Sequence, residues 1–383
     1  MRRGIALLLT LLALLAARAA SAEPARDVTG ECGVTIGGKK VSYRKMVDRR
    51  YSTYVTVKKG GVIEVDGKGL LLTAVQLQFY DRPTTFDIQV EQGGEWVTLH
   101  EGGSYLSDGL SLPEGAAKLR IRNTDKARMF LSELKVWTGE AEQLPQRWQE
   151  PGKADLMLLV AHCDDELLWF GGLLPRYAGE EQRSVQVAYL VPSTTTRRLE
   201  MLDAIWHCGV RTYPLFADMR DVRSSSLSGQ YKLWNRSRLQ ERVVEMIRRV
   251  QPEVIVTHDF AGEYGHGAHR AAADIAVRAL KASADESKHR DSARKYGVWQ
   301  VKKLYVHLYD ENPLVMDWHV PLERFGGKDA FRVAEEAFRH HASQVRNGWA
   351  IEEGGRYDNS RFGLYFTSVG PDAVGGDMFE NIE

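Results

Sequence analysis

Hydrophobic and polar residues alternate with a period of two in the first part of the chain, from about Tyr51 to Trp137. Turn-forming residues such as Gly60-Gly61, Gly93-Gly94 and Pro113 separate the short runs. Short strands at this spacing are typical of an antiparallel sandwich. We therefore predict an all-β, jelly-roll sandwich domain over residues 23–139.

A polar segment, residues 140–152, follows and is bracketed by Pro145 and Pro151, which is typical of a linker. Beyond it, short apolar runs alternate with stretches of helical period. The strand candidates are Leu156–Ala161, Val185–Val191, Tyr213–Phe216, Val254–Thr257 and Leu304–Leu308. The helix candidates are Glu166–Ala178, Arg198–His207, Arg238–Val250, His269–Lys281 and Lys328–His341. This alternation predicts an α/β domain over residues 153–383, with a doubly wound, mostly parallel, Rossmann-like sheet.

The N-terminus has the features of a secretory signal peptide. Arg2-Arg3 precedes the apolar run Ile5–Ala17, and Ala20-Ser21-Ala22 ends the segment with small residues. The alternative, a membrane anchor, is disfavoured because the apolar run is shorter than the ~20 residues that cross a bilayer. We therefore predict a signal peptide at residues 1–22, no membrane span, and a secreted or periplasmic protein.

Composition narrows the class of partner. The chain has 51 Lys+Arg and 51 Asp+Glu, and no basic block. Phosphate neutralisation requires clustered Lys and Arg, so we expect no nucleic-acid partner. Three cysteines are too few for a disulfide scaffold. Cys163 and Cys208 can pair only if the fold brings them together, and three free, buried thiols fit an odd count equally well.

Candidate chemistry lies where two of the predicted strands end. The strand at 156–161 runs into His162-Cys163-Asp164-Asp165-Glu166, and the strand at 254–257 runs into His258-Asp259 and then Gly262–His269. Open α/β sheets bind ligands at the carboxyl ends of their strands. Imidazoles and carboxylates meeting there form a mixed nitrogen and oxygen ligand set that suits Zn²⁺.

Each of these residues also has a purely structural interpretation. Paired acids before a helix often only cap its N-terminus, and a single His is more often a hydrogen-bonded structural residue than a ligand. Two clusters at two strand ends are much rarer than either alone, and this favours a metal site. The histidines that we interpret as structural are His207, His289, His307, His319 and His340.

The first cluster, residues 162–166, resembles the His-Pro-Asp-Asp-Glu motif of the PIG-L (LmbE-like) zinc-dependent N-deacetylase family, and 262–269 resembles its His-x-x-His motif. Residues 197–200, followed by Gly209-Val210, are similar to the family's Arg/Glu helix with its Leu-Gly-Val end. His341-Ala-Ser-Gln344 is similar to its His-x-Ser-Gln segment. The four motifs occur in order and cover roughly residues 155–344.

The resemblance implies that His162, Asp165 and His269 are the ligands of one catalytic Zn²⁺. Such an ion lowers the pKa of a bound water to about 7 and polarises a carbonyl oxygen. Three protein ligands with one open position are the usual arrangement of a catalytic zinc site.

The same resemblance implies roles for the neighbouring residues. Asp164 is the general base for the water, and His266 is the acid or the oxyanion stabiliser, with Tyr264 assisting. Glu166 orients the ligands without binding the metal. The residues that match substrate-contacting positions are Arg197 and Asp218.

Two positions depart from the family pattern. Cys163 stands where the family usually has Pro, and Gly267-Ala268 stands where an Asp often lies between the two histidines. If that Asp normally polarises a neighbouring His, another acid must take its role. Glu263 and Asp259 are both candidates.

The predicted sandwich is similar in its strand pattern to galactose-binding-like, discoidin-type modules. Such modules often bind glycans through loop aromatics, and the candidates here are Tyr51, Tyr80, Trp96 and Tyr105. For each of these residues, packing in the core or at a sheet edge is the simpler interpretation. Some modules of this kind also hold a structural Ca²⁺.

The leading hypothesis is a secreted zinc-dependent hydrolase that removes the N-acetyl group from an amino sugar such as N-acetylglucosamine, with a glycan as its partner. One alternative is a zinc amidase acting on a non-sugar N-acyl amine. The other is a catalytically silent glycan-binding protein. Bound zinc and acetate release from acetylated glycans distinguish these hypotheses.

Overall fold

The computed structural model describes residues 23–40, 43–141 and 144–382. The chain divides into two compact units, Met1–Arg147 and Trp148–Glu383. The predicted linker at 140–152 spans this division, and the predicted signal peptide at 1–22 lies outside the described residues.

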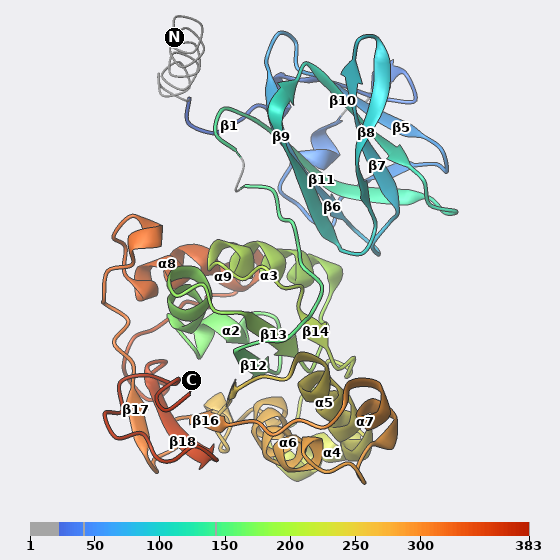
Figure 1. The fold of residues 1–383 in the computed structure, drawn as a ribbon. Helices are drawn as coiled ribbons and strands as arrows, with labels where there is room; N and C mark the ends of the chain where they lie inside the picture. The colour runs from blue at the N-terminus through green and yellow to red at the C-terminus, as the bar shows by residue number, and fades with distance from the viewer. Residues whose placement is uncertain (1–22, 41–42, 142–143, 383) are drawn as a thin grey trace, which may run out of the picture. The chain divides into compact units, whose positions relative to one another are not determined.

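The first unit is a sandwich of two antiparallel sheets (Figure 1). One sheet has the order β1-β11-β6-β9, with β4 also paired to β11, and the other has the order β3-β2-β5-β10-β7-β8. The strands of the first sheet are β1 Arg26–Asp27, β4 Val55–Val57, β6 Leu72–Phe79, β9 Ser107–Ala116 and β11 Met129–Thr138. Those of the second are β2 Gly33–Ile36, β3 Lys39–Lys40, β5 Val62–Asp66, β7 Phe86–Gln92, β8 Glu95–Gly102 and β10 Lys118–Asn123. The predicted antiparallel sandwich is confirmed.

The period-two pattern explains the core of this unit. On β5, Ile63 and Val65 are buried while Glu64 between them is exposed. Leu119 and Ile121 on the neighbouring β10 are buried in the same cluster. Alternate residues of a strand point to opposite faces, so one face of each sheet becomes apolar and the two apolar faces pack together.

The second unit contains a seven-stranded sheet with the order β14-β13-β12-β15-β16-β18-β17. Its strands are β12 Leu156–Val160, β13 Val185–Tyr189, β14 Leu215–Phe216, β15 Val254–Thr257, β16 Lys303–His307, β17 Pro313–Val315 and β18 Arg361–Thr367. The first five are parallel, as predicted, and β17 and β18 add an antiparallel edge.

Helices cover both faces of this sheet, as a doubly wound fold requires. Figure 1 shows α2, α3, α8 and α9 on one side and α4, α5, α6 and α7 on the other. Their bounds are α2 Asp165–Leu168, α3 Thr195–His207, α4 Leu227–Leu233, α5 Arg236–Val250, α6 Gly267–Ser283, α7 Arg290–Tyr296, α8 Ala330–Phe338 and α9 Ala342–Arg346. Five-residue strands that are buried throughout, such as β12 and β13, are typical of a sheet with both faces covered.

The strand order places a switch point beside β12. The chain passes from β12 to β13 and β14 on one side, and then returns to β15 on the other side of β12. The crossovers therefore diverge between β12 and β15, which leaves a crevice at the carboxyl ends of these two strands. Both predicted chemical clusters follow these two strands.

The predicted helix at 166–178 is interrupted in the structure. Helix α2 ends at Leu168, and a separate π-type turn covers Pro175–Glu180. Gly171 between them has a φ of +48°, which glycine adopts readily and which breaks the helical backbone. Two further differences are the short helix α4 and the antiparallel strands β17 and β18, for which the alternating pattern gave no prediction.

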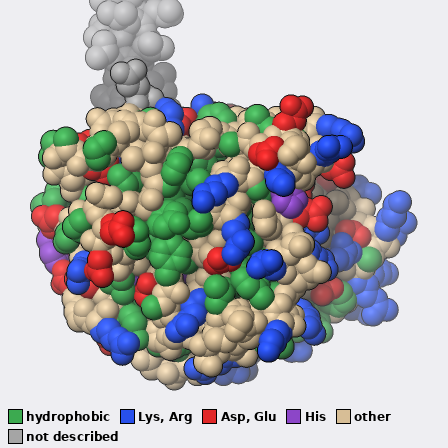
Figure 2. All heavy atoms as spheres, turned by 90° about the horizontal axis from the view of Figure 1, so that it is seen from below, with side chains coloured by type: hydrophobic (Ala, Val, Ile, Leu, Met, Phe, Trp, Pro, Cys, Tyr) green, Lys and Arg blue, Asp and Glu red, His purple; other side chains and the backbone are tan. Residues whose placement is uncertain are grey.

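Within the described part of the chain, no helix has both the length and the apolarity that a bilayer crossing requires. Figure 2 shows one face of the molecule, on which Lys and Arg side chains are spread among acidic and apolar ones. The three cysteines are buried and unpaired. The structure therefore has free, buried thiols and no pairing of Cys163 with Cys208.

Candidate active site

The segment after β12 turns sharply so that Asp165 faces back toward His162. The Asp165 carboxylate accepts a hydrogen bond from the His162 backbone N–H at 2.7 Å and another from the Trp169 indole at 2.9 Å. Its Oδ2 also lies 3.2 Å from His162 Nδ1. These contacts hold the first predicted ligand pair in one orientation.

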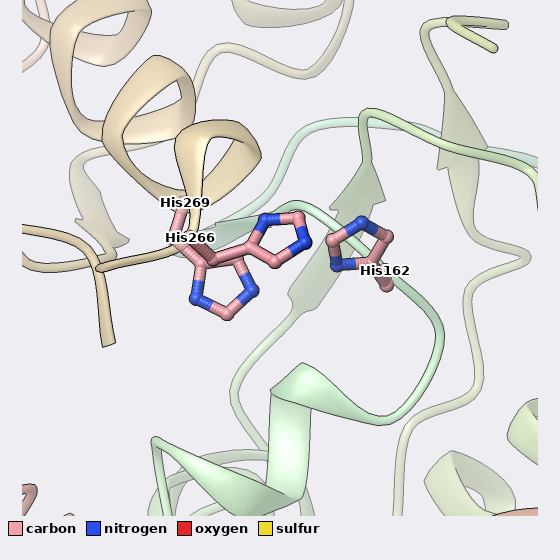
Figure 3. A group of neighbouring side chains, drawn as sticks. All are labelled: His162, His266 and His269. Atoms are coloured by element: carbon pink, nitrogen blue, oxygen red, sulfur yellow. The ribbon is translucent and has the colours of Figure 1, made fainter. Parts of the chain in front are cut away.

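The segment after β15 brings the second group of side chains to the same place. His266 caps α6, and His269 lies in the first turn of that helix. Figure 3 shows their rings facing His162, which comes from the loop after β12. The ring centroid of His162 lies 4.9 Å from that of His266 and 5.5 Å from that of His269.

These side chains form two overlapping groups that could hold a metal ion. Potential ligand atoms lie within 4.8 Å of one another in the group His162, His266 and His269, and likewise in the group Asp165, His258 and His269. His269 is common to both. The three predicted ligands, His162, Asp165 and His269, come from both groups. Asp165 contacts the other two.

The donor set fits a cation, because two acceptor atoms face each other. His269 Nε2 is buried and has no hydrogen-bond partner among the described residues. Its nearest charged neighbour is Asp165 Oδ1 at 3.4 Å. A lone pair aimed at a carboxylate oxygen is unfavourable unless a cation lies between them.

Glu263 fixes the orientation of His269. The buried Glu263 carboxylate lies 2.7 Å from Nδ1 of His269, 2.8 Å from Nδ1 of His258 and 2.7 Å from Nδ1 of His307. Burial alone would raise the pKa of Glu263, but these histidines hold it well below its usual range. An ionised carboxylate only accepts, so the proton of His269 is on Nδ1 and Nε2 is left free for a metal. Of the two candidate acids, Glu263 rather than Asp259 is therefore the one that polarises a neighbouring His. That histidine is His269 rather than His266.

His258 is a less suitable ligand than His269. Its Nε2 accepts the Ala161 backbone N–H at 3.1 Å. Burial lowers the pKa of His258, while the Glu263 and Asp165 carboxylates raise it further, to about 10. The Ala161 N–H lies at Nε2 and the Glu263 carboxylate lies at Nδ1, so both ring nitrogens of His258 already have partners within the protein.

His266 is held in one tautomer. Its Nδ1 accepts the Ala268 backbone N–H at 3.2 Å, so the ring proton is on Nε2. Burial, with His269 and His162 nearby, lowers the pKa of His266 to about 3, which keeps the ring neutral. A neutral ring with a proton on Nε2 is a hydrogen-bond donor rather than a metal ligand.

Asp164 lies at the cavity with a strained backbone. Its φ is +144°, a conformation that residues other than glycine rarely adopt. Arg197 donates to its Oδ2 at 2.8 Å and to the Cys163 carbonyl at 2.8 Å. Burial and the adjacent Asp165 raise the pKa of Asp164 to about 8 against the opposing effect of Arg197. In the amide orientation that satisfies both of its ends, Gln344 also donates to Asp164 at 3.3 Å.

Glu166 points away from the metal-site candidate. One of its oxygens accepts the Asp164 backbone N–H at 2.8 Å, and the other lies 2.7 Å from His341 Nε2. Glu166 and His341 are both fully buried. Glu166 therefore orients the backbone of Asp164. Its partner His341 comes from the segment that resembles the family's His-x-Ser-Gln motif.

The side chains surround a cavity of about 180 Å³. It is lined by His162, Asp164, Asp165, Leu168, Trp169, Arg197, Asp221, Tyr264, His266, Gln344 and Trp349. Asp218, the predicted substrate contact, is exposed and is not part of this lining. Asp221, three residues further along the chain, lines the cavity instead.

Other functional neighbours were missed from the sequence. His307, which we interpreted as structural, lies 2.7 Å from the Glu263 carboxylate through Nδ1 and 3.0 Å from the Asp358 carbonyl through Nε2. The sequence signal was its place near the end of the predicted strand Leu304–Leu308. No pattern in the sequence pointed to Trp169 or Trp349.

The predicted glycan-contacting aromatics of the first unit include two that are occupied by packing. Tyr80 stacks on Tyr54 with ring centroids 4.6 Å apart. The Arg120 guanidinium lies over the Trp96 ring at 4.5 Å. The simpler interpretation, packing, holds for these two side chains.

A buried set of imidazoles and a carboxylate converging at the switch point of an α/β sheet, beside a second carboxylate in a small cavity, is the arrangement of a metal-dependent hydrolase. Residues 157–280 match the family model described as PIG-L, GlcNAc-PI de-N-acetylase. The second unit therefore contains a PIG-L deacetylase domain.

A curated relative is the 1D-myo-inositol 2-acetamido-2-deoxy-alpha-D-glucopyranoside deacetylase 1 of Frankia casuarinae. It is 29% identical over 179 residues, which cover 39% of this chain and 57% of the relative. The chain thus spans less than two thirds of the length of this relative.

Solved structures resemble both units. The N,N′-diacetylchitobiose deacetylase of Pyrococcus horikoshii is 16% identical with a TM-score of 0.38, covering 50% of this chain and 71% of that one. The N-terminal region resembles family 32 carbohydrate-binding modules. One of these, from NanJ of C. perfringens, is 12% identical with a TM-score of 0.26, covering 30% of this chain and 98% of the module.

Proposed function

We propose that this protein is a zinc-dependent N-deacetylase that hydrolyses the N-acetyl group of an amino sugar of the N-acetylglucosamine type, alone or within a glycan. The observation that carries the proposal is a single cavity that is lined both by His162 and Asp165 of the buried metal-site candidate and by the Asp164 carboxylate held by Arg197. The PIG-L match over 157–280 and the deacetylase name of the Frankia relative support it.

His162, Asp165 and His269 would hold the zinc. Two imidazoles and one carboxylate are ligands that Zn²⁺ binds readily, and catalytic zinc sites use three protein ligands. The free Nε2 of His269 supports this choice over His258, whose Nε2 already accepts a backbone N–H. When bound, zinc supplies Lewis acidity toward the reacting oxygen atoms.

The remaining side chains have separate roles in amide hydrolysis. Asp164 takes a proton from the attacking water, and Arg197 fixes the direction of its carboxylate. His266 donates its Nε2–H to the oxyanion that develops on the acetamide oxygen, and the Tyr264 hydroxyl is a second donor at the same cavity. The C–N bond breaks as the protonated Asp164 returns its proton to the amine nitrogen, which gives acetate and the free amino sugar.

The test is an acetate-release assay combined with metal analysis. The substrates are acetylated amino sugars, chito-oligosaccharides and non-sugar N-acyl amines. Asp164→Asn should keep zinc and lose about 10²- to 10⁴-fold in kcat, because an amide cannot accept the proton. Asp291→Asn, at an exposed position on α7, is the matched control.

Each alternative has its own outcome. Near-normal kcat in Asp164→Asn would place the base elsewhere. Acetate release from non-sugar amines alone would identify the amidase. Bound zinc without release from any substrate would leave the catalytically silent glycan-binding protein.

For the first unit we propose glycan binding and a structural Ca²⁺ beside Asp48 and Glu133. Asp48 accepts the Thr53 hydroxyl and the Arg50 N–H, and the buried Glu133 accepts the same N–H at 3.1 Å. Carboxylates and backbone oxygens are the ligands that Ca²⁺ prefers. Ca²⁺ should raise the Tm of the wild type and have no effect on Asp48→Asn. If both proteins respond alike, this site is wrong.

We also propose that the protein is exported to the periplasm or the medium, on the pattern of residues 1–22. Mass spectrometry of the mature protein should find Glu23 at its N-terminus. A retained Met1 would contradict the signal peptide.

A further inference from the structure

One side of the active-site cavity is an aromatic wall. Trp169, Tyr264 and Trp349 all line it. Ring centroids lie 5.7 Å apart for Trp169 and Tyr264, 5.8 Å for Tyr264 and Trp349, and 6.2 Å for Trp169 and Trp349. Each ring contacts the other two, so the three form one continuous apolar surface.

The wall runs from the metal-site candidate out to solvent. Trp169, the inner ring, is 8% exposed and donates to Asp165. The outer rings of Tyr264 and Trp349 are 39% and 38% exposed. Single exposed aromatics are common, but here two adjacent rings are exposed at the mouth of a cavity that contains the reactive groups.

Both outer rings are attached to constrained backbone. Tyr264 has a φ of +43°, a left-handed conformation that is costly for a bulky residue and persists only where the surroundings impose it. The Trp349 backbone N–H donates to the Gln344 carbonyl at 3.1 Å, and Gln344 lines the same cavity. A rigid aromatic surface binds a ring with little loss of conformational entropy.

The rest of the cavity lining has a different chemistry. Arg197, Asp221 and Gln344 are polar and lie in the lining together with the aromatic wall. A sugar ring has an apolar C–H face and a polar edge of hydroxyls, so it matches a site with one aromatic and one hydrogen-bonding surface.

The size of the cavity indicates where a second ring would lie. Its volume of about 180 Å³ is below the ~300–1,000 Å³ of typical ligand pockets. Such a space accommodates an acetamido group and the ring that carries it. Any further ring of the substrate must lie at the mouth, where Tyr264 and Trp349 are exposed.

We propose that Trp349, with Tyr264, is a stacking platform for the sugar ring next to the one that is deacetylated, so that the preferred substrate is an oligosaccharide rather than a free amino sugar. This inference rests on the proposed function. Trp349 lies outside residues 157–280, which match the PIG-L model.

The experiment compares kcat/KM for N-acetylglucosamine with kcat/KM for N,N′-diacetylchitobiose and its tetramer. In Trp349→Ala, the ratio of oligosaccharide to monosaccharide kcat/KM should fall about 3- to 10-fold, and Trp349→Phe should restore most of it. Tyr365→Ala is the control, since Tyr365 is 37% exposed and lies outside the cavity lining. An unchanged ratio in Trp349→Ala would overturn the platform.

Binding of the tetramer to Asp164→Asn, measured by calorimetry with and without Trp349→Ala, separates this inference from the proposed function. If the wild type releases no acetate but Trp349→Ala weakens binding, the function is wrong and the platform stands. If Trp349→Ala binds as tightly as its parent, or the parent does not bind, the platform is wrong.

Discussion

Replacing Glu263 by Gln should weaken metal binding at the proposed zinc site without changing any proposed ligand. Glu263 accepts hydrogen bonds from three imidazoles, and one of these, His269, is a proposed ligand. Gln has almost the same shape, but its amide offers one oxygen and two N–H donors. At least one Nδ1–H must then face a donor or change tautomer.

The size of the effect follows from these contacts. Removing the partner that orients a metal-binding His typically costs 10- to 100-fold in metal affinity. At about 1.4 kcal/mol per factor of ten, this is about 1.4 to 2.8 kcal/mol. The folded state should also lose about 1–3 kcal/mol, because a buried donor is left without an acceptor.

The assay is competition for zinc against a chelator of known affinity, with circular dichroism to establish that the variant is folded. Asp259→Asn is the matched control, because Asp259 is the other acid of the same segment and its Oδ1 accepts only a local backbone N–H at 3.0 Å from Ala261 among its described contacts. If folded Glu263→Gln binds zinc within twofold of the wild type, His269 does not depend on Glu263 and is not the ligand that we infer.

Three further predictions concern other parts of the chain. His341→Gln should keep zinc but lower kcat about tenfold, since Glu166 loses the partner that fixes it under the Asp164 backbone; metal analysis and steady-state kinetics check this. Burial raises the pKa of Glu133 to about 7, and Asp48 adds to this increase. The folded state therefore keeps a proton that the unfolded chain has already released, so stability is lost as the pH rises through the folded pKa. Without Ca²⁺, the urea midpoint should decrease as the pH is raised from about 5 to about 8, and it should decrease less in Glu133→Gln. A shortened protein starting at Pro151 should keep turnover on small acetylated sugars and lose efficiency on polymeric glycan, whereas undiminished activity on both would argue against a role for the first unit.

Much of the fold followed from local pattern. The period-two runs of the first unit and the βαβ alternation of the second depend on neighbours close in sequence. The two chemical clusters could be paired in advance because parallel strands present their carboxyl ends at one edge. The prediction of a continuous helix over 166–178 was wrong because Gly171 adopts a positive φ, which hydrophobic periodicity does not reveal.

The rest of the site depends on contacts between distant residues. His341 is 175 residues from Glu166, and His307 is 44 residues from Glu263. His307 approaches Glu263 because β16 lies beside β15, and strand order is a property of the sheet rather than of either strand. Trp349 reaches the cavity from a segment without regular structure, so no periodicity could point to it.

The surroundings of four buried acids in the second unit support the proposal that Asp164 acts as the base. Asp164, Asp165, Glu166 and Glu263 are all buried close together, and like charges at such distances cannot all remain ionised without separate partners. Asp165 faces the histidines and the Trp169 indole, Glu263 faces three imidazole donors, and Glu166 is paired with His341 and a backbone N–H. These three carboxylates keep fixed donors that hold them in place. Asp164 lies at the cavity, and its pKa is raised to about 8 by burial and by Asp165 even with Arg197 beside it. Asp164 therefore differs from the other three in lying at the cavity with its charge compensated mainly by Arg197, and this position fits the base role that we propose for it.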